Sequence, residues 1–152
     1  MSIHTALVKN EEQKISLEKA KKFISSGDYG AESIFIGRVR NENGGKKVTA
    51  VTYDEHDQAV LKSFESICND AKKKFDENAK IFLEHAKGYA VVGEISILIA
   101  IGSGHRDEAF KICRYILEEV KHQSPIWKKE HYVDGKEEWL PGHSLRPKKE
   151  VK

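Results

Sequence analysis

The sequence has few of the residues that cross-link, stiffen or embed a chain. Its 152 residues include only two cysteines and three prolines, and so few cysteines exclude a scaffold built on disulfides. The longest apolar run, residues 95–101, contains a serine and is too short to span a bilayer. Residues 1–12 lack the apolar segment of a secretion signal. We therefore expect a cytoplasmic protein with no membrane partner.

The two cysteines, Cys68 and Cys113, stand far apart, so neither belongs to a closely spaced pair of metal ligands. Each falls in the apolar stripe of a predicted helix. Because free cysteines commonly act as small apolar residues, we interpret both as core residues rather than as redox or catalytic groups. We expect no metal site.

The chain also lacks a strong excess of charge of either sign. Its 26 basic and 24 acidic residues leave a net charge of +2, which does not favour nucleic acid as a partner. Hydrophobic residues make up 39% and charged residues 33%, a composition typical of a folded globular chain. The length predicts one domain over residues 1–152, in which about residues 141–152, including Pro147, Lys148 and Lys149, form a flexible basic tail.

Two kinds of periodicity predict the secondary structure. Apolar residues at helical spacing predict helices at about 17–24, 60–75 and 105–123, the first capped by Ser16. Alternating and β-branched runs predict strands at about 6–8, 33–40, 48–53, 80–85, 94–101, 127–132 and 137–140. The turns at 43–45 and 134–135 predict hairpins between the strands that flank them. The expected result is an α+β fold, with a mainly antiparallel sheet and three helices.

Two lysines flank a proline where the third predicted helix ends. Pro125 cannot continue a helix and pushes Ser124 out of the helical region, so Lys121 and Lys128 belong to different elements. Two ammonium groups brought together repel each other unless an anion lies between them. Beside an apolar wall, such as the core or rim aromatic Trp127, a lysine loses hydration and its neutral form is favoured. The pair indicates acid/base work on a phosphorylated substrate; the alternative for Lys121 is a helix-capping role.

A second basic group opens the same helix. His105 and Arg106 follow the turn 102–104, where a helix N-terminus offers free N–H groups to an anion and Arg106 adds a guanidinium fork for phosphate. Helical periodicity places both residues on the side that faces protein. The alternative, which the residues favour equally, is a structural cap with an ion pair from Arg106 to a buried acid.

Three further charged residues, Arg38, Arg40 and Glu130, are also considered as site residues. Arg38 and Arg40 stand two residues apart near a predicted strand end, and therefore on one face of the sheet. Adjacent like charges are unfavourable unless an anion or acid joins them. For Arg38 the residues alone favour plain surface charge. Glu130 is predicted to pair with Lys128 or Lys129.

Three segments, in this order, carry a family resemblance: Phe35 to Asn41, Ser103 to Arg106 and Lys121 to Glu130. Together they make residues 33–140 resemble the large, catalytic subunit of molybdopterin synthase. The resemblance implies an α/β-hammerhead-like fold and a sulfurtransferase of molybdenum cofactor biosynthesis. It also implies no cofactor of the chain's own, since the molybdopterin moiety of the molybdenum cofactor is the product.

The resemblance further implies the reaction and its partners. Two large subunits would form a central homodimer, and each would bind a small ubiquitin-like sulfur carrier with a C-terminal Gly-Gly thiocarboxylate, giving a heterotetramer. Two sulfur transfers to cyclic pyranopterin monophosphate would form the dithiolene. By motif, Lys121 and Lys128 would be catalytic, as acid/base or transient nucleophile, with the assignment between them open. The substrate-binding residues would be Arg38, Val39, Arg40, His105, Arg106, Lys121, Lys128, Lys129 and Glu130.

Two other functions fit parts of the same pattern. The chain could be a non-catalytic module that binds the C-terminal tail of a ubiquitin-like protein, with the basic residues taking its carboxylate. It could also bind or hydrolyse a phosphorylated nucleotide, but the sequence has no P-loop and no paired carboxylates for a metal.

The length of the third helix predicts how the two basic groups meet. Arg106 and Lys121 stand fifteen residues apart, which at the helical rise separates their backbones by about 22 Å. Two extended side chains cannot close that gap around a small substrate. We therefore predict that twofold packing sets His105 and Arg106 of one subunit beside Lys121 and Lys128 of the other.

Overall fold

The computed structural model describes residues 1–141, which form one eight-stranded sheet and three helices. The predicted basic tail from residue 142 onward lies outside the described residues. The helices are α1 (Leu17–Ile24), α2 (Asp57–Phe75) and α3 (Arg106–Gln123). The strands are β1 (Ile3–Lys9), β2 (Ala31–Arg38), β3 (Glu42–Asn43), β4 (Lys46–Glu55), β5 (Lys80–Val91), β6 (Ile95–Ser103), β7 (Ile126–Tyr132) and β8 (Glu137–Trp139). All predicted helices and strands are present, and β3 is the strand that the sequence pattern did not predict.

The sheet is built around β5. Neighbouring strands follow the order β2-β6-β5-β4-β7-β8, while β1 pairs with β5 and β3 pairs with β4. β6 pairs with residues 80–85 of β5, β1 with residues 81–87, and β4 with residues 88–91. Within residues 1–141, every strand pair except the parallel pair β1–β5 is antiparallel. The mainly antiparallel α+β fold is therefore confirmed.

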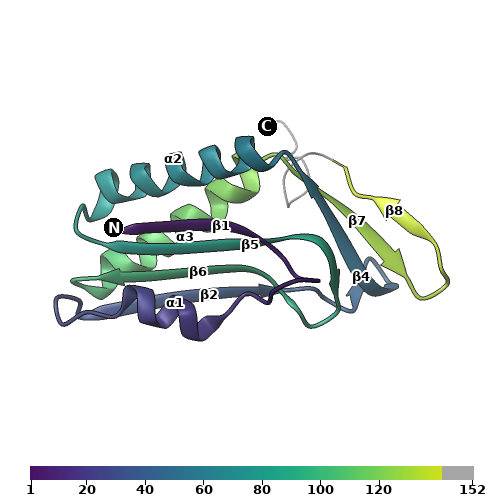
Figure 1. The fold of residues 1–152 in the computed structure, drawn as a ribbon, viewed down its shortest axis with the longest axis horizontal. Helices are drawn as coiled ribbons and strands as arrows, with labels where there is room; N and C mark the ends of the chain where they lie inside the picture. Colours follow the sequence, from purple (N-terminus) through teal and green to yellow (C-terminus); the bar gives the residue numbers. More distant parts are fainter. Residues whose placement is uncertain (142–152) are drawn as a thin grey trace.

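The strands separate into two parts that run in different directions (Figure 1). The main sheet consists of β1, β2, β6 and the first half of β5. The side sheet consists of β3, β4, β7, β8 and residues 88–91 of β5. The transition falls at Gly88, whose φ of +73° is a conformation that glycine adopts without strain. One strand thus belongs to both sheets.

Helices cover both faces of the main sheet. α1 packs on β5 and β6, and α3 packs on β6 and β2 from the other side, with α2 against α3 and β1 (Figure 1). This double cover explains why β6 has a nearly continuous apolar run, with no exposed surface from Leu98 to Ile101. The Oγ atom of Ser16 caps α1 as predicted, accepting a hydrogen bond from the N–H of Lys19 at 3.2 Å. No helix within residues 1–141 has the length and apolar character required to span a membrane.

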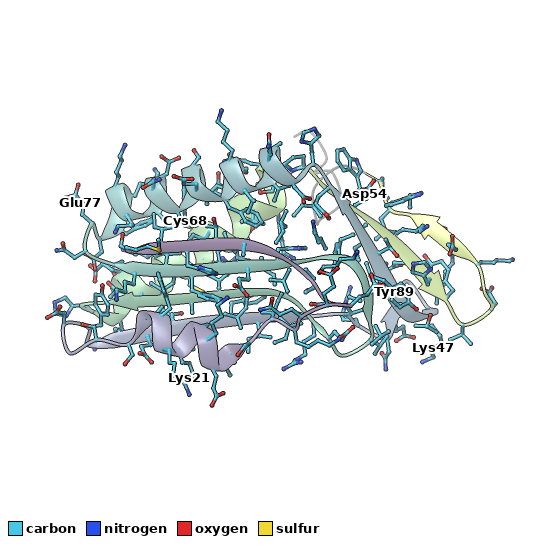
Figure 2. The ribbon with its side chains drawn as sticks, in the orientation of Figure 1. Lys21, Lys47, Asp54, Cys68, Glu77 and Tyr89 are labelled. Atoms are coloured by element: carbon cyan, nitrogen blue, oxygen red, sulfur yellow. The ribbon has the colours of Figure 1, made fainter. Side chains whose placement is uncertain are left out.

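Both cysteines belong to the core, as predicted. Cys68 has no exposed surface and Cys113 is 7% exposed, and Figure 2 shows Cys68 pointing from α2 toward the strands. Burial raises the pKa of Cys68 to about 12 and also raises the pKa of Cys113. Because the thiolate is the nucleophilic form, this shift disfavours reaction of either thiol.

The predicted hairpin between strands 33–40 and 48–53 is wrong, because β2 pairs with β6 and not with β4. β2 ends at Arg38 after a register shift at Gly37, and the N–H of Val39 then donates to the carbonyl of Glu94 at 3.0 Å. The chain crosses from the main sheet to the side sheet, where the turn 44–45 joins β3 to β4 instead. A two-residue strand is too short to show the alternation on which the prediction relied. The other predicted hairpin, β7–β8, is confirmed.

Candidate active site

A hydrogen bond from the buried Ser124 holds the break between α3 and β7. Ser124 follows α3 in the extended conformation that Pro125 requires, with φ −77° and ψ 129°. It has no exposed surface, and its hydroxyl hydrogen-bonds with the hydroxyl of Ser63 in α2 at 3.0 Å. Lys121 therefore lies in the last turn of α3 and Lys128 in β7, on separate elements as predicted.

Lys128 lies on the inner face of β7 and is partly buried. It stands directly across from Tyr53 of β4, which is 5% exposed. Burial lowers the pKa of Lys128, Glu130 opposes this shift, and the positive charges of Arg40 and Lys121 lower the pKa further. The β2–β3 connection, α3 and β7 thus bring three basic side chains close enough to act on one another. We call Arg40, Lys121, Lys128 and Glu130 the lysine site.

Glu130 is the acid of the lysine site. It lies on the same face of β7 as Lys128 and is 3% exposed. Its carboxylate accepts hydrogen bonds from Nδ2 of Asn43 at 3.0 and 3.1 Å and from the hydroxyl of Tyr132 at 3.0 Å. These neutral donors satisfy the buried carboxylate, whose charge favours the ammonium form of Lys128. The predicted ion pair of Glu130 with Lys128 or Lys129 is absent within residues 1–141: Lys129 pairs with Glu137, and Lys128 shares the face of Glu130 without lying within ion-pair distance.

Lys129 points to the opposite face of β7. Its Nζ atom lies 3.4 Å from the carboxylate of Glu137 and 5.2 Å from the centre of the Trp139 ring, both on β8. Trp127 shares this face and is 38% exposed, which fits a rim position. The structure therefore separates Lys129 from Lys121 and Lys128, although all three stand in one predicted segment.

Arg38 and Arg40 do not share a sheet face as predicted, because β2 ends at Arg38 and a bulge precedes it. The guanidinium of Arg38 donates to the carbonyl of Gly93 at 2.8 Å, which fits the structural alternative for this residue. Val39 is 4% exposed and packs in the core. Arg40 is exposed at the edge of the lysine site, where its charge acts on Lys128.

His105 and Arg106 form a second basic group at the N-terminus of α3, which we call the anion end. His105 is the N-cap residue, with extended φ −135° and ψ 154°, and Arg106 begins the helix. Both are exposed, so the prediction that they face protein is wrong for a single chain. Within residues 1–141 Arg106 forms no ion pair, so the alternative of a salt bridge to a buried acid finds no support there.

Asp76, at the C-terminus of α2, holds the turn that carries the anion end. The hydroxyl of Ser103 donates to its carboxylate at 2.6 Å, and the backbone N–H groups of Asn78 and Gly104 donate as well. Burial alone would raise the pKa of Asp76, but these hydrogen bonds and the charge of Lys72 outweigh it and lower the pKa. Sequence reasoning missed Asp76, because its role depends on two loops that are distant in sequence.

The two basic groups lie at opposite ends of α3, which is continuous from Arg106 to Gln123. At the helical rise their backbones are about 22 Å apart. In Figure 2, Glu77, the neighbour of Asp76, lies at one end of the molecule and Tyr89 of the side sheet lies toward the other. One chain therefore does not unite the predicted site residues.

Two further residues at the lysine site were missed from the sequence. Asn43, which binds Glu130, stands in a turn signal and reads as a turn residue. His85 is fully buried on β5, and its pKa is lowered to about 4 by burial first and also by the charges of Lys121 and Lys128, while a hydrogen bond to Ala86 opposes this. No spacing rule in the sequence connects His85 with either lysine.

Comparison with known proteins supplies the family. The family model described as MoaE protein matches residues 10–123. The molybdopterin synthase catalytic subunit of Synechococcus elongatus is 41% identical over 131 residues, which cover 86% of this chain and 79% of that protein. The protein of the same name from Pyrococcus abyssi is 38% identical over 144 residues, which cover 95% of each.

Solved structures agree in fold. The crystal structure of molybdopterin synthase from Staphylococcus aureus superposes with a TM-score of 0.82 at 28% identity, covering 90% of this chain and 96% of that one. A chain from the complex of subunits 1 and 2 of the molybdopterin-converting factor from Helicobacter pylori superposes with a TM-score of 0.73 at 21% identity, covering 92% of each. The second likeness concerns the fold alone.

Proposed function

The chain belongs to the MoaE protein family, and we propose that it is the catalytic subunit of a molybdopterin synthase, which transfers two sulfur atoms from a thiocarboxylated carrier to cyclic pyranopterin monophosphate. The observation that carries this proposal is the match of 95% of the chain, at 38% identity, to a molybdopterin synthase catalytic subunit. A module that only binds the tail of a ubiquitin-like protein is not favoured, because these relatives are named catalytic subunits.

The lysine site supplies the chemistry in this proposal. Sulfur transfer from a thiocarboxylate to a phosphorylated pterin brings together two anions, which Arg40, Lys121 and Lys128 neutralise. A lysine with a lowered pKa exchanges its proton near neutral pH more readily than an exposed one, which suits Lys128 to acid/base work or to transient attack on the carrier's carbonyl. Sulfur must arrive on the partner, since Cys68 and Cys113 are buried thiols.

The anion end supplies the phosphate site. His105 and Arg106 stand at the N-terminus of an 18-residue helix, where free N–H groups and the helix dipole favour an anion. Both side chains are exposed and can reach a ligand from outside the chain. Because α3 separates them from Lys121, the complete site requires a second subunit.

A homodimer with shared active sites meets this requirement. β2 is the end strand of the sheet, and between it and α3 lies an apolar groove of about 750 Å³ lined by residues such as Phe35, Tyr115 and Leu117. Phe110 of α3 lines the same groove and is 66% exposed. A second copy packed here along α3 would bury this surface and could set the two ends of paired helices side by side.

The remaining partner is the small sulfur carrier. The Helicobacter pylori structure holds subunits 1 and 2 of the molybdopterin-converting factor together, and a corresponding arrangement here gives a heterotetramer of two large and two small subunits. The chain works in the cytoplasm in this proposal, without a cofactor of its own.

One assay tests the function directly. The purified chain is mixed with a thiocarboxylated ubiquitin-like carrier and cyclic pyranopterin monophosphate, and molybdopterin is measured. We expect product that depends on both additions, with the carrier left as a carboxylate. A folded protein that binds the carrier tail but yields no product would support the tail-binding module instead.

A further inference from the structure

Glu130 is a buried acid beside a group of cations. It is 3% exposed on the inner face of β7, directly across from Val51 of β4, which is 2% exposed. Lys128 lies two residues away on the same face, and Arg40 and Lys121 are the cations that act on Lys128. Within residues 1–141, however, Glu130 takes part in no ion pair. A buried carboxylate without a counter-ion is unfavourable unless hydrogen bonds replace the water that it has lost.

Neutral donors take the place of a counter-ion at Glu130. Nδ2 of Asn43 donates to Oε1 at 3.0 Å and to Oε2 at 3.1 Å, and the hydroxyl of Tyr132 donates to Oε1 at 3.0 Å. That hydroxyl stays neutral, because burial together with the hydrogen bond and charge of Glu130 raises the pKa of Tyr132 to about 12. Among residues 1–141, Asn43 is therefore the donor that binds both carboxylate oxygens, and it leaves the negative charge of Glu130 unneutralised.

The opposite face of β7 shows the contrasting arrangement. There the carboxylate of Glu137 pairs directly with Lys129 at 3.4 Å and with His131 at 3.0 Å. An acid that only joined neighbouring strands could bind a cation in this way on the inner face as well. Glu130 instead binds the amide of Asn43, from the two-residue strand β3, although Lys128 stands on its own strand face. The arrangement keeps the charge of the acid close to the lysine without tying the two together.

We propose that Asn43 is a positioning residue of the lysine site, whose amide holds the carboxylate of Glu130 in place beside Lys128 and apart from the surrounding cations. This rests on the proposed function, because the same site carries the chemistry there. The consequence is a balance at Lys128. Burial and the charges of Arg40 and Lys121 favour its neutral form, and Glu130 is the acid that opposes them. Asn43 therefore acts on the chemistry through Glu130.

Two further titratable residues pack behind Lys128, and both are neutral at physiological pH. Tyr53 on β4 stands directly across from Lys128, and burial raises its pKa to about 12. His85 on β5 meets the ring of Tyr53 edge-on, with the centroids 5.0 Å apart, and burial lowers its pKa to about 4. Near neutral pH, a change in the titration of Lys128 therefore reports on its charged neighbours and not on these two rings.

A double-mutant cycle tests whether Asn43 acts through Glu130. Asn43→Leu keeps the approximate size of the side chain and removes the donor, whereas Glu130→Gln keeps the shape of the acid and removes its charge. We expect Asn43→Leu to lower kcat about tenfold in the wild type but less than about twofold in Glu130→Gln, where no charge is left to position. An equal loss of kcat in the two backgrounds would overturn the proposal.

The pH dependence of kcat supplies a readout that a purely structural role would not move. In Asn43→Leu, the limb that belongs to Lys128 should move to lower pH by about half a unit to one unit, because Lys128 loses the fixed charge that favours its ammonium form. The control is Glu42→Gln on the same strand, since Glu42 is exposed and lies 3.9 Å from Lys47. It should leave the profile unchanged. A profile in Asn43→Leu that matches the control would overturn the proposal.

A titration without turnover measures the same balance. In protein with ¹³C-labelled lysine, the Cε signal of Lys128 should titrate at lower pH in Asn43→Leu than in the wild type, and at the wild-type pH in Glu42→Gln. Asn43→Ser, whose hydroxyl donates one hydrogen bond at most, replaces Asn43→Leu if that variant does not fold, and should shift the signal in the same direction. Unchanged titration of Lys128 would overturn the proposal. The expected shift in a protein that makes no molybdopterin would instead reject the proposed function and uphold the role of Asn43.

Discussion

The two ends of α3 carry basic residues in opposite environments. At the anion end, His105 and Arg106 are exposed, and only the turn beneath them is fixed, by Asp76. At the other end, Lys121 and Lys128 are partly buried, and their surroundings include the fully buried His85. In the proposed function, this difference means that one chain already builds the environment for proton transfer, whereas the anion end would gain its surroundings from a second subunit.

Removing Lys121 from the lysine site should have the largest effect on turnover. Lys121 transfers a proton in the proposed mechanism, so we expect Lys121→Ala to lower turnover by about 100-fold to 10,000-fold. The thermal unfolding midpoint should change little, because this side chain is not part of the apolar core. Molybdopterin formation and a melting curve measure the two effects. Wild-type turnover by Lys121→Ala would remove this residue from the mechanism.

Lys129, on the opposite face of β7, supplies a matched control for Lys128 of the lysine site. Lys128→Ala should lose most activity, whereas Lys129→Ala should lose little, because Lys129 binds Glu137 and lies over Trp139 on the other face. Both variants remove one positive charge from neighbouring positions of one strand. Equal losses in the molybdopterin assay would mean that general surface charge matters rather than a positioned lysine.

Combining the two ends from different subunits should restore activity. When Arg106→Ala and Lys121→Ala proteins exchange subunits, one of the two sites in each mixed dimer has every group intact, and the assay is run well below the KM of Arg106→Ala, where each variant alone has little activity. Random exchange of equal amounts should return about a quarter of the wild-type rate. Differently tagged chains verify that mixed dimers form. If they form and the rate stays at the background of the separate variants, the site is not shared.

Removing the anion end alone should weaken binding more than chemistry. A phosphate fork acts in the ground state as well as in the transition state, so Arg106→Ala should raise the apparent KM about tenfold or more, with a smaller change in kcat. Initial rates over a range of pterin concentrations separate the two constants. A fall in kcat at constant KM would contradict the phosphate role. It would also mean that the anion end, like the lysine site, acts on the chemical step.

The smallest effect should come from the support beneath the anion end. Asp76→Asn weakens hydrogen bonds from Ser103 and Gly104, and we expect a loss of about 1–2 kcal/mol at neutral pH. The pKa of Asp76 is lowered in the folded state, so its stabilisation is present above its usual value of 3.8 and is lost as the pH falls through the lowered pKa. Denaturant unfolding at pH 7 and pH 3 should therefore give a larger difference between wild type and Asp76→Asn at pH 7.

Local patterns in the sequence were sufficient to predict most of the fold. Ser16, the apolar stripes of the helices and Pro125 act within a few residues of themselves, so the helices and the break before β7 could be predicted. The pairing of β2 with β6 could not, because the bulge at Gly37 and the two-residue β3 depend on where the chain crosses between sheets.

The residues of the candidate site likewise divide into those that local sequence predicts and those that it does not. Lys121 and Lys128 were placed on separate elements from Pro125 alone, and the distance from Arg106 followed from helix geometry. His85, Asn43 and Asp76 were missed, since each acts on a residue that is distant in the sequence and is brought near by the sheet or by a neighbouring loop. The exposure of His105 could not be predicted either, because periodicity reports the face of a helix and not which partner covers its end.

The continuity of β5 through both sheets decides where this protein tolerates a change of length. Side chains alternate along a strand, so one residue inserted or deleted between Lys80 and His85 would turn His85 to the opposite face and displace every pairing beyond it. The turn at Asp134 and Gly135 is exposed and lies at the tip of the side sheet, beyond the lysine site. A label, a linker or a fused domain therefore belongs in that turn, and the strand that joins the sheets must keep its length.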